Sequence, residues 1–380
     1  MDNLRILAVA DLWQGSNAYA FVRALRRLGH SVRTVPSENF VPGKWRARPL
    51  RGLRRLLEPA LVDEYTAELL REAELLRPHL FFVYKGHYVT AEAVQGVRAR
   101  GAVAVDVFPD VSVLAHGRWI PRALPEYDWV FTTKKFGLGD MERLLGVRRA
   151  SFLPHGFDPE VHRPLPLSAE DRAAYACDVS FVGTWSPKKQ SWLEHLARHL
   201  VAHAPGARLR VWGEQWGSAR RALGDCLESR PVLGLEYAKA VQASRINLGI
   251  LSEARQGASS GDQITSRTFH IPACGGFLLH ERTAELAEHF REGEECAAFE
   301  GPEEMAAQVV RFLGQEAERV RIAAAGRSRV EREASIDHRA AVVLAKVAEL
   351  RGGPHPLAPS PASAGEGGRT ADPAPRGTGS

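Results

Sequence analysis

The sequence is poor in cysteine and has no long hydrophobic run, and both absences narrow the class of protein. Its four cysteines lie far apart and form no Cys-x-x-Cys pair, so we expect neither a structural zinc site nor a disulfide framework. No stretch approaches the roughly 20 apolar residues that a membrane span needs. The N-terminus lacks a basic segment followed by a long apolar run, so we expect no secretory signal and a cytoplasmic location.

Positive charge is only slightly in excess, with a formal net charge of +5 over 380 residues. No zinc-finger spacing and no aromatic RNA-binding signature accompanies it, so we do not expect nucleic-acid binding. One segment gathers five arginines: Arg46, Arg48, Arg51, Arg54 and Arg55. Two interpretations stay open for this patch, a solvated helix face or a weak contact with an anionic membrane surface.

Strand-like and helix-like patterns alternate along most of the chain. In the first half, strand patterns occupy 4–10, 31–36, 79–85, 102–108, 128–133 and 149–154. A second series begins at 177, after a proline-rich stretch that resembles a linker. Strands separated by helices are typical of doubly wound parallel sheets. The sequence therefore predicts an α/β protein with two tandem Rossmann-like domains.

The predicted boundaries follow from these patterns. Residues 1–155 form the first domain, 156–176 the linker and 177–350 the second domain. Residues 351–380 are rich in Pro, Gly, Ala and Ser, so we expect a disordered tail. Ligands of such sheets bind beyond the carboxyl ends of the strands, which predicts a cleft between the domains.

The segment 180–192 predicts an anion site. A buried strand ends at Gly183, Ser186 is placed to cap the next helix, and the first turn carries Lys188 and Lys189. Cations at a helix N-terminus oppose the helix dipole, and a bound anion would remove this conflict. A diphosphate fits this site, although the lysines of a solvated helix start would give the same pattern.

The segment 261–279 gathers further polar groups before a glycine pair. Arg267 can clamp a phosphate, and Asp262 and His270 are spaced to bond hydroxyls of a sugar or ribose. A packing role for His270 is the alternative. The predicted donor-binding set is Gly183, Thr184, Lys188, Lys189, Gly213, Asp262, Arg267, Thr268, His270 and Gly275.

Loops of the first domain supply candidates for the other side of the cleft. Those predicted to face an acceptor are Asp11, Trp13, Asn17 and His155, with Trp13 as a stacking platform for a sugar ring. Candidates for a base were sought at strand ends among His87, Asp106, Asp110 and His116. We take His87 and Asp110 as the catalytic candidates, and a plain loop role is the alternative for each.

The motifs LPHGFDP (153–159), VG with a lysine pair (182–189), WG (212–213) and SRTFHIPACGGFLL (266–279) resemble the group 1 GT-B glycosyltransferases. Within that group the match is strongest to the CgeB-like spore-maturation branch. The resemblance extends over about residues 150–345 and is weaker before them.

The resemblance implies a hexosyl-type transferase that binds a nucleotide sugar in its C-terminal half and an acceptor in its N-terminal half. It further implies no bound metal and no cofactor, and it favours retention of configuration. Relatives commonly carry a Glu-x7-Glu pair, where this chain has Asp262 and His270. The acceptor, whether saccharide, lipid, protein or metabolite, is not identified by the sequence.

Three other functions were weighed. A nucleotide-sugar epimerase would share the cleft but use water in place of an acceptor. A non-catalytic GT-B-like assembly or coat-associated protein would account for His270 in the place of Glu. A dinucleotide oxidoreductase requires Gly-x-Gly-x-x-Gly after the first strand, and residues 10–18 contain a single glycine.

Overall fold

The computed structural model describes residues 3–41, 51–228 and 230–352. The arginine patch falls largely outside this part: Arg46 and Arg48 are not described, and for Arg51, Arg54 and Arg55 only the backbone is. The expected tail from residue 353 onward also lies outside the described residues. None of the described helices is long and apolar enough to cross a membrane. All four cysteines are described, and each is a free thiol.

The N-terminal domain is built on a six-stranded parallel sheet in the order β2-β1-β3-β4-β5-β6. Alternate side chains of its strands point to opposite faces, so Val103, Val105 and Val107 of β4 join one core and Ala104 and Phe108 the other. The strands are β1 (Arg5–Val9), β2 (Ser31–Thr34), β3 (Leu80–Tyr84), β4 (Val103–Phe108), β5 (Trp129–Thr132) and β6 (Ala150–Phe152). Its helices include α1 (Asn17–Arg27), α2 (Arg51–Leu76), α3 (Ala91–Ala99), α4 (Trp119–Ala123) and α5 (Lys135–Leu145), with short 3-10 turns η1 (Ser37–Asn39) and η4 (Leu124–Glu126).

The C-terminal domain repeats this plan with a five-stranded parallel sheet in the order β11-β10-β9-β7-β8. Its strands are β7 (Cys177–Val182), β8 (Leu209–Trp212), β9 (Ser244–Gly249), β10 (Leu278–Glu281) and β11 (Ala297–Phe299). Its helices include α6 (Ala169–Tyr175), α7 (Pro187–His203), α8 (Arg220–Leu223), α9 (Leu235–Gln242), α10 (Ser266–Ala273), α11 (Ala284–His289), α12 (Pro302–Leu313) and α13 (Glu316–Glu333), with 3-10 turns η5 (Trp216–Ala219) and η6 (Gly224–Cys226). Two Rossmann-like α/β domains were predicted, and the structure confirms them.

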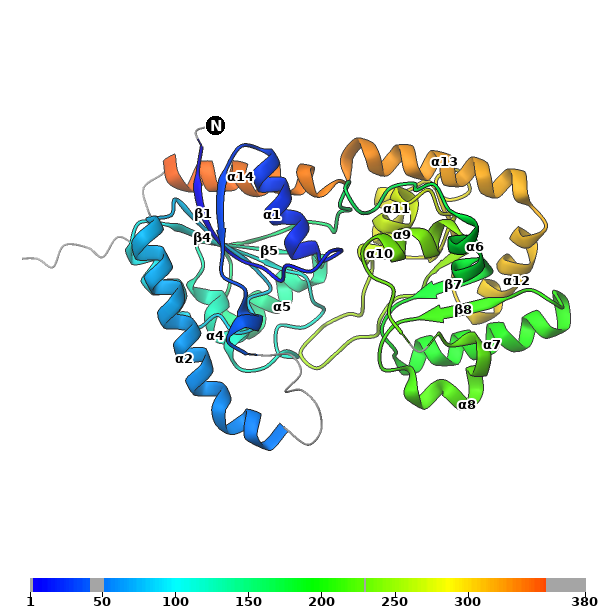
Figure 1. Ribbon diagram of the computed structural model, residues 1–380, viewed down its shortest axis with the longest axis horizontal. Coiled ribbons are helices and arrows are strands. Elements are labelled where there is room, and N and C mark those ends of the chain that lie inside the picture. Colours follow the sequence, from blue (N-terminus) through cyan, green and yellow to red (C-terminus); the bar gives the residue numbers. More distant parts are fainter. Residues whose placement is uncertain (1–2, 42–50, 229, 353–380) are drawn as a thin grey trace, which may run out of the picture.

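The predicted end of the second domain is wrong, because the last helix belongs to the first. The apolar pattern over 316–350 predicts one long helix, but these residues form two, α13 and α14 (Ile336–Gly352). Ala340, Val343 and Val347 of α14 are fully buried in the core that also contains β1 and β3. Figure 1 shows α13 lying on the C-terminal domain and α14 lying on the N-terminal domain beside α1.

The chain therefore crosses between the domains twice, and the two crossings are hydrogen-bonded to each other. Phe157 N donates to Ala334 O at 3.0 Å, and Ile336 N donates to Phe157 O at 2.8 Å. A side chain at Gly156 would lie 2.8 Å from Ala334 O, so glycine permits this close approach. The predicted linker is thus an ordered crossing that also includes α6.

Candidate functional site

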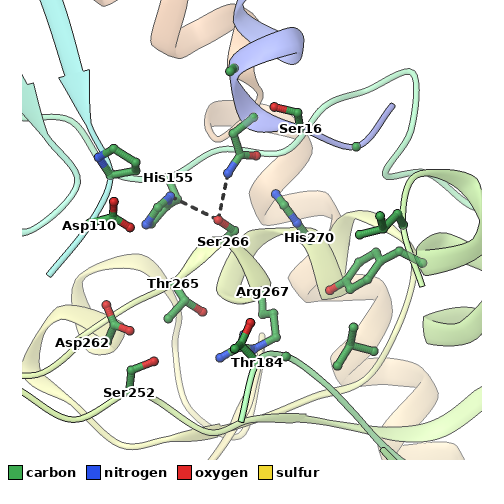
Figure 2. A pocket seen from close by; sticks show the side chains of 18 of the residues that line it. Ser16, Asp110, His155, Thr184, Ser252, Asp262, Thr265, Ser266, Arg267 and His270 are labelled. Carbon is green, nitrogen blue, oxygen red and sulfur yellow. Dashed lines mark hydrogen bonds between the residues drawn. The ribbon is translucent and has the colours of Figure 1, made fainter. Parts of the chain in front are cut away.

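A cavity of about 730 Å³ lies between the two domains, at the carboxyl ends of both sheets. The N-terminal domain lines it with the loops that follow β1, β3, β4, β5 and β6. The C-terminal domain lines it with the loops after β7, β8 and β9 and with the first turns of α9 and α10. The cavity therefore lies where the strand topology places a ligand site, and Figure 2 shows residues of its wall.

Most of the predicted site residues line this cavity. They are Asp11, Trp13, Asn17, Asp110, His155, Gly183, Thr184, Lys189, Asp262, Arg267 and His270. The structure does not bring five others to the wall: His87, Lys188, Gly213, Thr268 and Gly275.

Helix α7 begins as the sequence predicts, but its two lysines have different partners. Ser186 Oγ accepts from Lys189 N, and Pro187 occupies the first helical position. Lys189 is 4% exposed, and its ammonium donates to Thr184 O at 3.2 Å and to Ser252 Oγ at 2.9 Å. Burial, with a smaller contribution from the charge of Arg267, lowers the pKa of Lys189 to about 7.

Lys188 is held away from the cavity by acidic residues. Its Nζ lies 2.6 Å from Glu281 Oε1 and 4.5 Å from the centre of the Trp192 ring. Its backbone N–H donates to Glu253 Oε1 at 2.8 Å, so a carboxylate complements the helix N-terminus beside it. The structure thus corrects the expectation that both lysines face the ligand.

Arg267, the second residue of α10, stands near Lys189 at the same wall. One of its terminal nitrogens donates to Ile250 O at 2.8 Å, while its buried Nε has no hydrogen-bond partner among the described residues. A side chain at Gly183 would lie 3.0 Å from another of its nitrogens, so glycine leaves room for the guanidinium. Desolvation lowers the pKa of Arg267.

No carboxylate of the described residues forms an ion pair with either cation, although the charge of Asp262 acts on both and that of Glu253 on Lys189. Within the described residues, neither Lys189 nor Arg267 forms an ion pair, although the chain has many others. Enclosed cations are unfavourable unless an anion joins them. The wall is therefore electrostatically incomplete, and an anion such as a diphosphate would complete it.

His270 has a structural contact as well as a place on the wall. Its Nε2 lies 3.1 Å from Gly156 O, and its ring stacks on His162 with centroids 3.7 Å apart. Burial lowers the pKa of His270 to about 3, so the ring is neutral. A carbonyl partner places the proton on Nε2 and leaves Nδ1 as an acceptor. The structure thus shows the packing role of His270, and its ring also lines the cavity.

On the acceptor side, Asp110 is brought into the cavity and His87 is not. Asp110 forms an ion pair with Lys85 at 2.7 Å and lies 3.2 Å from His116 Nε2. The ring of His87 packs edge-on against Tyr88 at 4.4 Å. Trp13 is 47% exposed, which leaves its ring available for stacking.

Asp106, a further candidate base, is buried in the sheet. Its side chain is 1% exposed and has no hydrogen-bond partner among the described residues. Burial, with a smaller contribution from the charge of Asp110, raises the pKa of its carboxyl well above the usual range. It does not line the cavity, and the structure gives it no path to an acceptor.

Three of the predicted donor residues support the site from behind the wall. Thr268 is fully buried; its Oγ1 accepts from Thr265 N and lies 2.9 Å from His280 Nε2. Gly213 has a φ of +143°, and a side chain there would lie 2.0 Å from Gly183 O. Gly275 faces Pro164, at a separate groove. Thr268 thus supports α10 and Gly213 the Gly183 loop, and none of the three reaches the cavity.

Sequence reasoning missed several residues of the wall. The clearest is Lys134, which follows β5 directly and crosses to the other domain, where it lies 2.5 Å from Asp262. Its position after a strand was a usable signal, since such loops meet at one edge of the sheet. Others are Tyr84, Lys85, His162, Gln215, Tyr237, Ser252, Arg255 and Ser266.

Among the residues described, no group of three or more His, Cys, Asp or Glu side chains is arranged to hold a metal ion.

Residues 188–345 match the family of glycosyl transferase-like proteins. A search of curated proteins gives no match. The predicted likeness to glycosyltransferases is thus supported over most of the C-terminal domain, and the finer assignment to the CgeB-like branch is not.

Solved structures show the same two-domain GT-B fold. HepE from Anabaena, solved in complex with UDP-glucose, is 12% identical with a TM-score of 0.65, over 92% of this chain and 100% of that one. Sucrose-phosphate synthase from Thermosynechococcus elongatus is 15% identical with a TM-score of 0.62, over 92% and 99%. A glycosyltransferase from Rickettsia africae is 11% identical with a TM-score of 0.62, over 92% and 99%.

Proposed function

We propose that this protein transfers a sugar, of the hexose class, from a nucleotide sugar to an acceptor, without a bound metal ion and with retention of configuration. The glycosyl transferase-like match over 188–345 and the GT-B fold support a glycosyltransferase. The observation that carries the proposal is the pair of enclosed cations, Lys189 and Arg267, which share one cavity wall and form no ion pair with a carboxylate of the described residues.

In this proposal the two cations hold the donor diphosphate. When the bond to the sugar breaks, negative charge grows on the leaving diphosphate, and cations already in place stabilise it without rearrangement. The backbone at Gly183 and Thr184 lies beside them, where the absence of a side chain at 183 permits close approach. This arrangement supplies the charge that a metal ion supplies in other transferases.

Asp262 and His270 would then face the sugar and the ribose. Both are buried residues on the cavity wall. A carboxylate oxygen and a neutral imidazole nitrogen are both acceptors, so each suits a hydroxyl group. Because imidazole offers one acceptor where a carboxylate offers several, His270 would bind fewer hydroxyls than the usual Glu.

The surroundings of Asp110 favour retention. An inverting transfer needs a base that takes the acceptor proton. The carboxylate of Asp110 already contacts the Lys85 ammonium at 2.7 Å, so it is not free to take that proton. Asp110, Lys85 and Trp13 would instead orient an acceptor on the N-terminal side of the cavity. The acceptor itself stays open.

The test is a calorimetric titration with UDP, GDP, ADP and dTDP, each in the presence of EDTA. We expect one nucleotide to bind at micromolar concentration. The Lys189→Ala/Arg267→Ala variant should lose at least about a hundredfold in affinity, because each charge-assisted contact contributes roughly 1.5–3 kcal/mol.

Lys188→Ala is the matched control, since Lys188 lies in the same helical turn but pairs with Glu281. We expect it to bind as the wild type does. If the wild type binds none of the four nucleotides, the donor site is wrong and a non-catalytic relative becomes the better account. Nucleotide binding that requires a divalent cation would contradict the proposal that the protein works without a bound metal ion.

A further inference from the structure

A buried lysine of the N-terminal domain reaches into the C-terminal domain at the cavity wall. Lys134 is 3% exposed, and its Nζ lies 2.5 Å from Asp262 Oδ1. It also donates to Ile264 O at 3.1 Å and lies 3.4 Å from His155 Nε2. The ammonium group is thus held by one ion pair and two hydrogen-bond contacts.

His155 extends this contact into a network that joins both domains. Burial, with a contribution from the charge of Lys134, holds the pKa of His155 well below its usual range, so the ring is neutral. Its Nε2 faces an ammonium group and must accept, which places the proton on Nδ1, 3.3 Å from Ser266 Oγ. Asn17 donates to the same oxygen at 3.0 Å, as the dashed lines in Figure 2 show.

The network fastens three segments of one domain to the other domain. Lys134 and His155 lie in the loops after β5 and β6, Asn17 begins α1, and Asp262 and Ser266 belong to the C-terminal domain. All five residues line the cavity. Any opening of the domains must therefore separate Lys134 from Asp262 and leave two charges to be solvated again.

Asp262 is only partly engaged by this contact. Lys134 contacts its Oδ1, and no hydrogen bond from the described residues reaches its Oδ2. Since Asp262 borders the cavity, the second oxygen is available to a ligand hydroxyl. A carboxylate held at one oxygen by a buried ammonium group has a fixed orientation.

We propose that Lys134 is a positioning residue that couples recognition of the transferred sugar to closure of the two domains. It holds Asp262 oriented toward the sugar, and it does so only when the domains are closed. The inference rests on the proposed function, because that function places the sugar beside Asp262. It adds a residue of the acceptor domain to the recognition of the donor.

The first test compares a nucleotide sugar with its free nucleotide. UDP and UDP-glucose serve as probes. Lys134→Met should lower the affinity for UDP-glucose by about tenfold or more, the usual effect of one lost contact to a charged group. The affinity for UDP should change by less than about twofold, because Lys189 and Arg267 hold the diphosphate. If the calorimetric titrations show that another nucleotide binds best, the diphosphate and the glucose diphosphate of that nucleoside replace these probes.

A double-mutant cycle separates a shared role from two independent ones. If Lys134 acts through Asp262, the Lys134→Met/Asp262→Asn variant binds UDP-glucose no more weakly than Asp262→Asn alone. Additive losses would overturn the inference. Lys135→Met is the matched control, because this neighbouring lysine is 39% exposed and pairs with Glu288 outside the cavity. It should leave both affinities unchanged.

Domain closure has its own measurement, which requires no nucleotide. Small-angle X-ray scattering of the unliganded protein should give a larger radius of gyration for Lys134→Met than for the wild type and Lys135→Met. Equal radii, or equal losses of UDP and UDP-glucose affinity, would overturn the coupling. If the wild type binds no nucleotide, the proposed function fails, and the scattering result still decides whether Lys134 closes the domains.

Discussion

At the residue scale, the site depends on how similar residues divide their roles. Lys188 and Lys189 are adjacent and look equivalent in the sequence, yet one pairs with Glu281 and the other is buried beside Arg267. The helix start was predictable from Ser186 and Pro187, and the anion site there stays a prediction. The division was not predictable, because it depends on Glu253 and Glu281, which lie more than 60 positions away in the chain.

The lowered pKa of Lys189 predicts a pH dependence of donor binding. In the protein without ligand, Lys189 has a pKa of about 7. A bound diphosphate raises this pKa, because the anion favours the charged form of the side chain. Affinity is therefore fully present below pH 7 and falls above it, by at most about tenfold per pH unit. Titration with a nucleotide sugar between pH 6 and 9 measures this, since its diphosphate does not change charge in that range.

Lys189→Arg is the control for this prediction. Arginine stays protonated throughout the range, so the variant should bind with little dependence on pH. A wild type whose affinity is constant from pH 6 to 9 would show that Lys189 does not touch the diphosphate.

At the scale of elements, the loop after β8 supports the loop after β7. A methyl group at Gly213 would lie 2.0 Å from Gly183 O, and the φ of +143° disfavours any other residue. Gly213→Ala should displace the Gly183 loop and weaken nucleotide binding by roughly tenfold or more. In Gly217→Ala a methyl group meets nothing within 4 Å, so this variant should bind normally. If calorimetry gave Gly213→Ala the same nucleotide affinity as the wild type, Gly213 would not support the Gly183 loop.

The last helix gives a second prediction at this scale. Val343 of α14 is fully buried against the N-terminal sheet, while its neighbour Val342 is 47% exposed. Val343→Ala should lower the free energy of unfolding by about 1–3 kcal/mol, and Val342→Ala by less than about 0.5 kcal/mol. Urea unfolding measures both. Similar losses in the two variants would mean that α14 does not pack as described.

The helices themselves were easier to predict than the domain to which they belong. The apolar pattern over 316–350 predicts a long helix, and it continues with little interruption through the break at Ala334 and Ser335. What divides it is the tertiary bridge to Phe157, a contact that no local pattern encodes. Similarly, Thr268 carries a ligand-like polar group, but its buried bond to His280 makes it a structural residue.

At the scale of the whole molecule, buried neutral histidines predict sensitivity to acid. Burial lowers the pKa of His270 to about 3 and that of His280 to about 4, and it lowers those of His155 and His162 well below their usual range. In the unfolded chain these rings have a pKa of about 6.5. Above pH 6.5 both states are neutral, and below it the unfolded chain takes up protons that the folded protein cannot.

Stability should therefore fall as the pH drops from 6.5 toward 4, by about 1 kcal/mol per pH unit for each such histidine. Asp106, Glu38 and Glu285 act in the opposite direction, because burial raises the pKa values of their carboxyls. The urea concentration at the midpoint of unfolding, measured at pH 7 and at pH 5, gives the net effect of these groups on stability. An unchanged midpoint would show that these rings are not buried and neutral.

The most direct test of the central claim is a crystal structure of the protein with the nucleotide sugar that binds most tightly, grown in EDTA. The account predicts a diphosphate between Lys189 and Arg267 with no metal ion, and the sugar beside Asp262 in a closed cavity. A diphosphate bound elsewhere, or one held through a metal ion, would contradict the donor site and the function built on it.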